Sequence, residues 1–224
     1  MIYKYDEKLA YDYENGFNLT SDIKRLSNIV SHWEIYKKIV ELPGEIVELG
    51  VFKGGSFLRL ASYRNMLENE WSRKIIGFDV FDEFPRTQNK GDQIFREEWV
   101  EETNNEFATE KDIQDALDWK GIKNTELVKG DIALTIPKYL EKHPYLRIAL
   151  LHIDTDIYEP AKIGLDYLYE RIVPGGIILL DDYGVAGETD AVDEFLKDKD
   201  LMLQKFSFSQ LKPTYIVKKR LEEK

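Results

Sequence analysis

Acidic residues at or near the carboxyl ends of five short apolar segments are the feature of this sequence that could do chemistry. The segments are 46–49, 74–79, 126–131, 146–154 and 176–182, and their acids are Glu48, Asp79, Asp131, Asp154, Asp181 and Asp182. One such carboxylate is usually a turn residue or a helix N-cap. Acids on all five segments favour a shared site, because ligands of open parallel sheets bind outside the carboxyl ends of the strands.

The five segments are predicted strands of one sheet. They are apolar throughout, which is typical of strands covered on both faces. Helical patterns lie around them, at 21–42, 56–69, 159–171 and 189–197. Alternation of strands with helices indicates a parallel sheet. Two further segments, 200–206 and 213–218, predict a closing antiparallel pair. The fold class is therefore α/β, with a doubly wound, mostly parallel sheet.

A glycine-rich turn follows the first predicted strand, in the run VELGVFKGGS at 47–56. Glycines free backbone N–H groups and let a ligand approach closely. The dinucleotide pattern G-x-G-x-x-G is missing, since Phe52 stands where a glycine belongs, and no phosphate loop follows. A nucleoside ligand without a pyrophosphate fits better, and Glu48 suits a cationic one such as S-adenosylmethionine. A tight strand-to-helix turn without a ligand is the alternative.

The composition excludes several classes of protein. With 224 residues, of which 43% are hydrophobic, the chain can bury one substantial core. The net charge of -11 argues against a nucleic-acid partner. Apolar stretches far shorter than roughly 18 residues, and a charged beginning, predict neither a membrane span nor a signal peptide, hence a cytoplasmic protein. Since the sequence has no cysteine and three histidines, any metal would be held mostly by oxygen.

Five motifs occur in the order VELGVFKGGS, FDVFDEFP, VKGDIALTIP, LLHIDTDIYEP and PGGIILLDDYG. Together they resemble the macrocin O-methyltransferase family, the metal-dependent methyltransferases that act on deoxysugars of macrolide and aminocoumarin antibiotics. The resemblance covers 44–197, and it implies a seven-stranded, Rossmann-like class I methyltransferase fold with a reversed last strand. The second motif departs from the family in having Asp82 and Glu83 where an acid and a glycine are usual.

The resemblance also assigns cofactor contacts to individual positions. It implies that the methionine end of S-adenosylmethionine is lined by Glu48, Gly50, Gly54 and Ser56. Asp79 would accept the ribose hydroxyls, because two adjacent hydroxyl donors match two acceptor oxygens. The adenine side would lie against Gly130, Asp131 and Ile132.

A metal site is implied as well, with the ligands Asp154, Asp181 and Asp182. Three carboxylates favour a hard cation, Mg²⁺ first and Mn²⁺ or Ca²⁺ as a substitute. A solvated Asp-Asp turn is the alternative. His152 projects to the same strand face as Asp154, and both are candidate catalytic residues, although a histidine in a buried strand is more often hydrogen-bonded core than a catalyst. The two remaining histidines are interpreted as surface or packing residues, namely His32 and His143.

The connection between the second and third predicted strands is unusually long, with about 46 residues after Asp79. Its stretch 82–124 is a predicted helical insertion, either packed on the core as an embellishment or forming a lid over an acceptor pocket together with the helix around Trp33. We interpret the chain as a single methyltransferase domain, 1–224, with a helical extension at 1–43.

The sequence thus predicts an O-methyltransferase that depends on S-adenosylmethionine and Mg²⁺ and acts on a hydroxyl of a sugar, nucleotide-linked or glycosidic. Coordination to a dication favours the alkoxide and so activates a weakly nucleophilic hydroxyl. Two alternatives stay open, an NAD-linked oxidoreductase on a similar sheet and a non-catalytic cofactor-binding module. The acceptor and the oligomeric state, including a homo-oligomer, are also open.

Overall fold

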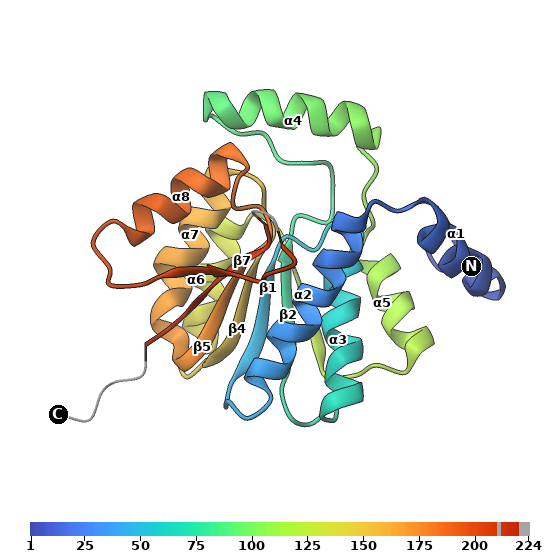
Figure 1. The fold of residues 1–224 in the computed structure, drawn as a ribbon, viewed down its shortest axis with the longest axis horizontal. Coiled ribbons are helices and arrows are strands. Elements are labelled where there is room, and N and C mark those ends of the chain that lie inside the picture. The colour runs from blue at the N-terminus through green and yellow to red at the C-terminus, as the bar shows by residue number, and fades with distance from the viewer. Residues whose placement is uncertain (210–211, 220–224) are drawn as a thin grey trace.

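The computed structural model describes residues 1–209 and 212–219 and contains one sheet of seven strands (Figure 1). The strands are β1 (Glu45–Leu49), β2 (Ile75–Asp79), β3 (Thr125–Lys129), β4 (Ile148–Ile153), β5 (Ile172–Leu180), β6 (Leu203–Lys205) and β7 (Thr214–Val217). Their order in the sheet is β3-β2-β1-β4-β5-β7-β6. Strands β1 to β5 are parallel, and β7 is antiparallel to β5 and β6. The predicted seven-stranded, mostly parallel sheet is confirmed.

Helices cover both faces of the sheet (Figure 1). One face is covered by α6 (Ile132–Lys142), α7 (Tyr158–Leu168) and α8 (Ala186–Leu196), and the other by α2 (Ile23–Ile39), α3 (Gly55–Leu67) and α5 (Glu110–Lys120). Successive strand side chains point to opposite faces, so Val47 packs in the first layer and Ile46 in the second. This double burial explains why the parallel strands are apolar throughout.

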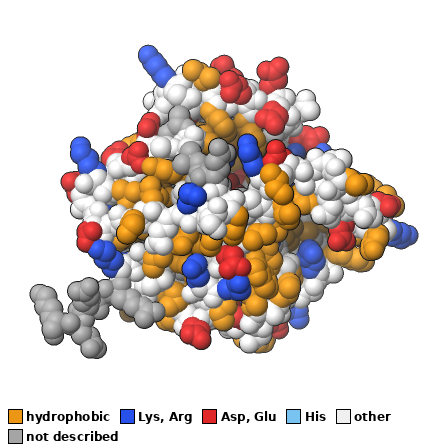
Figure 2. All heavy atoms as spheres, in the orientation of Figure 1, with side chains coloured by type: hydrophobic (Ala, Val, Ile, Leu, Met, Phe, Trp, Pro, Cys, Tyr) orange, Lys and Arg blue, Asp and Glu red, His pale blue; other side chains and the backbone are white. Residues whose placement is uncertain are grey.

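The N-terminal part of the chain contains two helices instead of the single predicted one. Helix α2 begins at the N-cap Asp22, whose side chain accepts a hydrogen bond from the backbone of Lys24, and it buries Ile35 and Ile39. A further helix, α1 (Ala10–Thr20), follows the 3-10 turn Glu7–Leu9 and has no buried residue. Figure 2 shows hydrophobic side chains exposed over these N-terminal helices. Helix α1 therefore contributes little to the core.

The predicted insertion between β2 and β3 forms two helices. Helix α4 (Lys90–Thr103) lies above the sheet in Figure 1, and α5 packs beside α3. A second 3-10 turn, Tyr169–Arg171, connects α7 to β5. Within the described residues every helix is too short or too polar to cross a bilayer.

The strand order reverses between β1 and β4, which are neighbours in the sheet although two strands separate them in the chain. A crevice forms at such a point because the connections of the two halves leave the sheet in opposite directions. The predicted acids at the ends of β1, β2, β4 and β5 are therefore brought to one place.

Candidate functional site

A large cavity lies at the carboxyl ends of the strands, with a volume of about 1670 Å³. Its wall comes from the ends of β1, β2, β4 and β5, the first half of α2, and the segment from Asp82 to Phe107. A single small-molecule pocket usually encloses about 300–1,000 Å³. The cavity therefore has room for a cofactor and an acceptor together.

The glycine turn after β1 is held in a conformation that requires glycine. Gly50 has a φ of +85°, and a Cβ there would lie 1.9 Å from the backbone oxygen of Asp154. Gly54 has a φ of +80°, and a Cβ would lie 2.5 Å from the side chain of Ile113. Phe52 also has a positive φ, 51°, at the position where the dinucleotide pattern has glycine. The turn thus brings the end of β1 directly against the end of β4.

Asp79 fixes this turn through its carboxylate. One oxygen accepts hydrogen bonds from the backbone N–H groups of Val51 and Phe52, at 2.6 and 2.8 Å, and the other accepts from Phe81 at 2.7 Å. The side chain also lines the cavity. Because a carboxylate offers about four lone-pair positions, these bonds leave capacity for a ligand hydroxyl.

The predicted cofactor residues divide into two groups. Those that line the cavity are Gly50, Ser56, Asp79, Asp131 and Ile132, and those outside its wall are Glu48, Gly54 and Gly130. Asp131 is the N-cap of α6, where its side chain accepts from the backbone of Ala133 at 2.8 Å. Gly130 precedes it with a φ of +135°, so it shapes the turn.

Glu48, a predicted contact of the cofactor, does not itself line the cavity. Its side chain is fully buried, because strand alternation directs it toward α3 instead of over the edge of the sheet. There it accepts a hydrogen bond from the Ser56 hydroxyl, and one of its oxygens lies 3.6 Å from His152 Nδ1. Glu48 therefore faces the protein interior, between Ser56 and His152.

His152 is also fully buried, on the same face as Glu48, and it does not line the cavity. Its Nε2 lies 3.4 Å from Asp181 Oδ1, and within the described residues neither ring nitrogen has a hydrogen-bond partner. Burial favours the neutral ring, but Asp181 and Glu48 raise the pKa of His152 well above its usual value. His152 therefore lies behind the cavity wall, beside Asp181 and Glu48, and its catalytic role stays a prediction.

Carboxylates crowd the ends of β4 and β5. Asp154, Asp181 and Asp182 all line the cavity, together with Asp156. Burial, and then the charges of Asp181 and Asp182, raise the pKa of Asp154 well above its usual value. Burial and Asp182 do the same for Asp156. One cation is close, since Lys212 Nζ lies 2.8 Å from Asp182 Oδ1. The three predicted metal ligands thus lie at the wall of one cavity, where their charges interact and a further cation would stabilise them.

Glu188, which the sequence analysis did not single out, ties the two acid-bearing loops together. It is fully buried at the start of α8. One of its oxygens accepts a hydrogen bond from the backbone of Asp182 at 3.1 Å, and the other accepts from Thr155 at 3.4 Å. No local pattern could have revealed this role, because both partners come from other elements.

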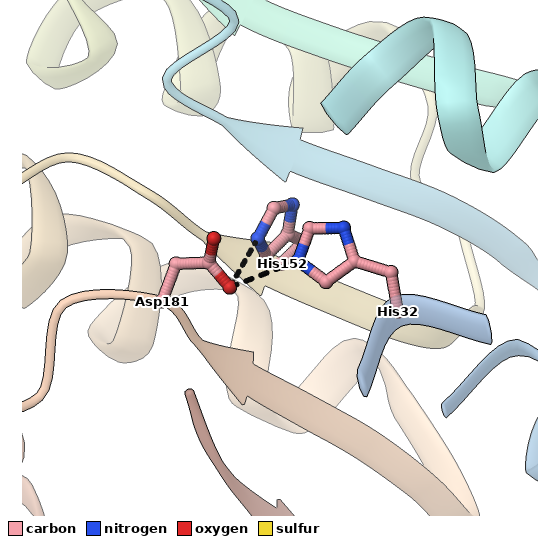
Figure 3. A group of neighbouring side chains, drawn as sticks. All are labelled: His32, His152 and Asp181. Atoms are coloured by element: carbon pink, nitrogen blue, oxygen red, sulfur yellow. Dashed lines mark hydrogen bonds and ion pairs between the residues drawn. The ribbon is translucent and has the colours of Figure 1, made fainter. Parts of the chain in front are cut away.

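His32 is not the surface or packing residue that the sequence predicted. It is fully buried on α2, and its Nε2 lies 3.0 Å from Asp181 Oδ1 (Figure 3). Burial is the main cause that lowers the pKa of His32. A signal existed, since His32 lies three residues before Ile35 and seven before Ile39, on the apolar face of the helix. His143, in contrast, is exposed and stacks on Tyr139.

Two groups of potential metal ligands have donor atoms that all lie within 4.8 Å of one another. They are His32, His152 and Asp181, and Glu48, His152 and Asp154. Among the described residues the predicted trio of carboxylates is not such a group. The helix around Trp33 lines the cavity through residues 23–30, whereas the Trp33 ring itself packs against Tyr63 and does not line it.

The sheet order, the glycine turn and the acid after β2 define a class I, S-adenosylmethionine-dependent methyltransferase. Residues 16–206 match the family described as macrocin-O-methyltransferase (TylF), and the chain belongs to this family of O-methyltransferases. Membership excludes the NAD-linked alternative.

Similar proteins include a tetracenomycin rhamnosyl 4'-O-methyltransferase of Streptomyces olivaceus, 26% identical over 84% of this chain and 70% of the relative. A demethyldecarbamoylnovobiocin O-methyltransferase of Streptomyces niveus is 26% identical over 80% of this chain and 68% of the relative. Among solved structures, the methyltransferase NovP superposes with a TM-score of 0.73 at 22% identity, covering 88% of this chain and 81% of that one. The calicheamicin methyltransferase CalS11 gives 0.68 at 24%, covering 95% and 86%. These superpositions support the fold.

Proposed function

We propose that the protein transfers a methyl group from S-adenosylmethionine to a hydroxyl of a sugar, with a divalent metal ion at the carboxylate cluster. The observation that carries the proposal is the contact between Gly50 and Asp154. It joins the glycine turn, where the cofactor would bind, to the carboxylates after β4 and β5. The methyl donor and the groups that would activate the acceptor would then face one cavity.

The donor set fits a hard dication. Asp154, Asp181 and Asp182 would hold it, because all three line one cavity and because burial, together with the charges of Asp181 and Asp182, raises the pKa of Asp154. Mg²⁺ is the first choice and Mn²⁺ a substitute. When bound, the ion supplies Lewis acidity that lowers the pKa of an acceptor hydroxyl.

The remaining work is done by residues of the chain. Asp79 and the glycine turn would fix the cofactor, so that its methyl carbon, its sulfur and the attacking oxygen lie in line. Asp154 is the proposed catalytic carboxylate, because it lies at the cavity wall beside the turn. Glu188 accepts hydrogen bonds from the backbones of both acid-bearing loops and so connects them. The buried His152 lies 3.4 Å from Asp181 Oδ1.

Aromatic side chains favour a sugar as the acceptor. Phe52, Phe95 and Trp99 line the cavity, and Trp99 lies 5.7 Å from Phe52 and 6.1 Å from Phe95 between ring centroids. Such faces offer the flat apolar area that the C–H face of a sugar ring can cover. A rhamnosyl O-methyltransferase among the relatives, and a solved TDP-rhamnose 3'-O-methyltransferase of similar fold, favour the same substrate class.

The test is turnover of a panel of nucleotide-linked and glycosidic sugars with methyl-labelled cofactor, followed by mass spectrometry of the products. We expect the label on one sugar hydroxyl. Label transfer to phenolic acceptors, with none to any sugar, would contradict the proposed substrate class.

A further inference from the structure

The two oxygens of the Asp181 carboxylate are held from the N-terminal helix α2. Asn28 Nδ2 donates a hydrogen bond to Oδ2 at 2.8 Å, and His32 Nε2 lies 3.0 Å from Oδ1. Asn28 and His32 are four residues apart, so they share one face of the helix. Asp181 itself follows β5. The orientation of this carboxylate therefore depends on α2 as well as on β5.

Arg59 on α3 determines how both partners are oriented. Its Nη1 lies 3.2 Å from Asn28 Oδ1 and 2.9 Å from His32 Nδ1. A guanidinium is always charged and only donates. Asn28 must then turn its carbonyl oxygen to Arg59 and its NH₂ to Asp181. Likewise, His32 Nδ1 must accept, which leaves its proton on Nε2.

The fixed tautomer decides what His32 can do. Its Nε2–H donates to Asp181 Oδ1, so this nitrogen has no lone pair for a metal. Ligation through Nε2 would move the proton to Nδ1, where it would meet the N–H of Arg59. The cluster of His32, His152 and Asp181 in Figure 3 resembles a two-histidine, one-carboxylate metal site, but Arg59 makes it unsuitable as one.

We propose that Arg59, Asn28 and His32 position the Asp181 carboxylate for a divalent cation, an inference that rests on the metal-dependent function proposed above. Two fixed donors leave the other lone pairs of Asp181 for the cavity, which the residue lines. Helix α2 thus supports the metal site and also forms part of the cavity wall. His32 and Asn28 are positioning residues, because they act through Asp181.

The test compares Mn²⁺ affinity of the full chain, with S-adenosylhomocysteine bound, for the wild type, His32→Leu and His32→Gln by titration calorimetry. A glutamine amide can still donate to Asp181, whereas leucine cannot. We expect His32→Leu to weaken Mn²⁺ binding about 10- to 100-fold, the usual loss when a group that orients a metal ligand is removed. His32→Gln should recover part of it, and the affinity for S-adenosylhomocysteine should not change.

Asn28→Ala removes the second donor and provides the comparison if His32→Leu does not fold. Lys37→Ala is the matched control on the same helix, because Lys37 makes an exposed ion pair with Glu34 at 2.7 Å and such pairs contribute little. Wild-type Mn²⁺ affinity in both Asn28→Ala and the folded His32 variants would overturn the proposal.

Pulsed electron paramagnetic resonance of the bound Mn²⁺ separates positioning from ligation. We expect no nitrogen coupling that depends on His32. A coupling that disappears in His32→Gln would make His32 a ligand and overturn the proposal. If the wild type binds no Mn²⁺ at all, the metal-dependent function itself fails, and this inference fails with it.

Discussion

Gly50 is the residue at which the glycine turn after β1 contacts the end of β4, where Asp154 lies. Its position leaves no space for a side chain, since a Cβ would lie 1.9 Å from the backbone oxygen of Asp154. Gly121, at the end of α5, also has a positive φ, +64°, but a Cβ there would meet nothing within 4 Å. Substitution of Gly121 therefore tests backbone strain alone, whereas substitution of Gly50 tests backbone strain together with steric overlap.

Gly50→Ala should therefore destabilise the protein more than Gly121→Ala. Left-handed backbone costs a non-glycine residue about 1–2 kcal/mol, which is all we expect for Gly121→Ala in denaturant unfolding. Gly50→Ala adds the displacement of β4 and should also abolish cofactor binding. Equal losses of unfolding free energy in the two variants would show that the close approach of β1 to β4 is not required.

Asp79→Ala should weaken binding of S-adenosylhomocysteine about tenfold or more, because it removes the acceptor of three backbone N–H groups as well as the proposed ribose acceptor. At about 100 times the wild-type Kd, the ligand stabilises the folded state by about 2.7 kcal/mol, and a tenfold weaker affinity halves this to about 1.4 kcal/mol. The rise in melting temperature on ligand addition measures the change. A full rise in Asp79→Ala, matching that of the exposed control Glu83→Ala, would remove Asp79 from the cofactor site.

The elements of the sheet were predictable because their local signals agree with the global fold. Apolar runs at 46–49 and 176–182 became β1 and β5, since strands buried on both faces must be apolar. The site was predictable only where residues lie at strand ends. Glu48 follows strand alternation into the interior, and the contact of His32 with Asp181 depends on the packing of α2 on one face of the sheet. Such contacts between distant elements leave no periodic signal.

Asp92 joins the insertion to the rest of the fold. From the first turn of α4, its carboxylate accepts a hydrogen bond from the backbone of Tyr158 at 2.8 Å, at the start of α7. A Cβ on Gly187 of α8 would lie 2.0 Å from its other oxygen. Burial is the main cause that raises the pKa of Asp92. The charged form is therefore unfavourable in the folded state.

This shift predicts the pH dependence of stability. A raised pKa in the folded state contributes stability that is present below the unfolded pKa and is lost as the pH rises through the folded value. Asp92→Asn cannot ionise, so its melting temperature relative to the wild type should increase between acidic and neutral pH. Asp198→Asn is the matched control, because it makes the same substitution at an exposed position. A difference in melting temperature between Asp92→Asn and the wild type that does not change with pH would show that burial does not raise the pKa of Asp92.

The aromatic wall of α4 predicts a separation of acceptor from cofactor effects. Trp99→Ala should raise the KM for the sugar about 3- to 10-fold, the equivalent of a lost aromatic contact, with cofactor affinity unchanged. Trp119→Ala is the control, because Trp119 is exposed on α5 and does not line the cavity. If Trp99→Ala weakens cofactor and acceptor binding equally, the insertion is structural support and not an acceptor lid.

At the scale of the whole molecule, the site is assembled from distant parts of the chain. Asn28 and His32 come from α2, the glycine turn follows β1, and the proposed metal ligands follow β4 and β5. The chain carries a net charge of -11, and several of its carboxylates are concentrated in this one cavity. A dication would relieve the repulsion among these carboxylates, so we expect the activity to depend on a metal.

Metal dependence is tested by the rate of methyl transfer to the sugar as a function of free Mg²⁺, after chelation and confirmed metal removal. We predict that the rate vanishes in chelator and returns with Mg²⁺. In Asp182→Ala it should stay absent at every concentration while S-adenosylhomocysteine still binds. An undiminished rate in the metal-free wild type would contradict the metal-dependent mechanism and leave Asp154 to activate the hydroxyl as a base alone.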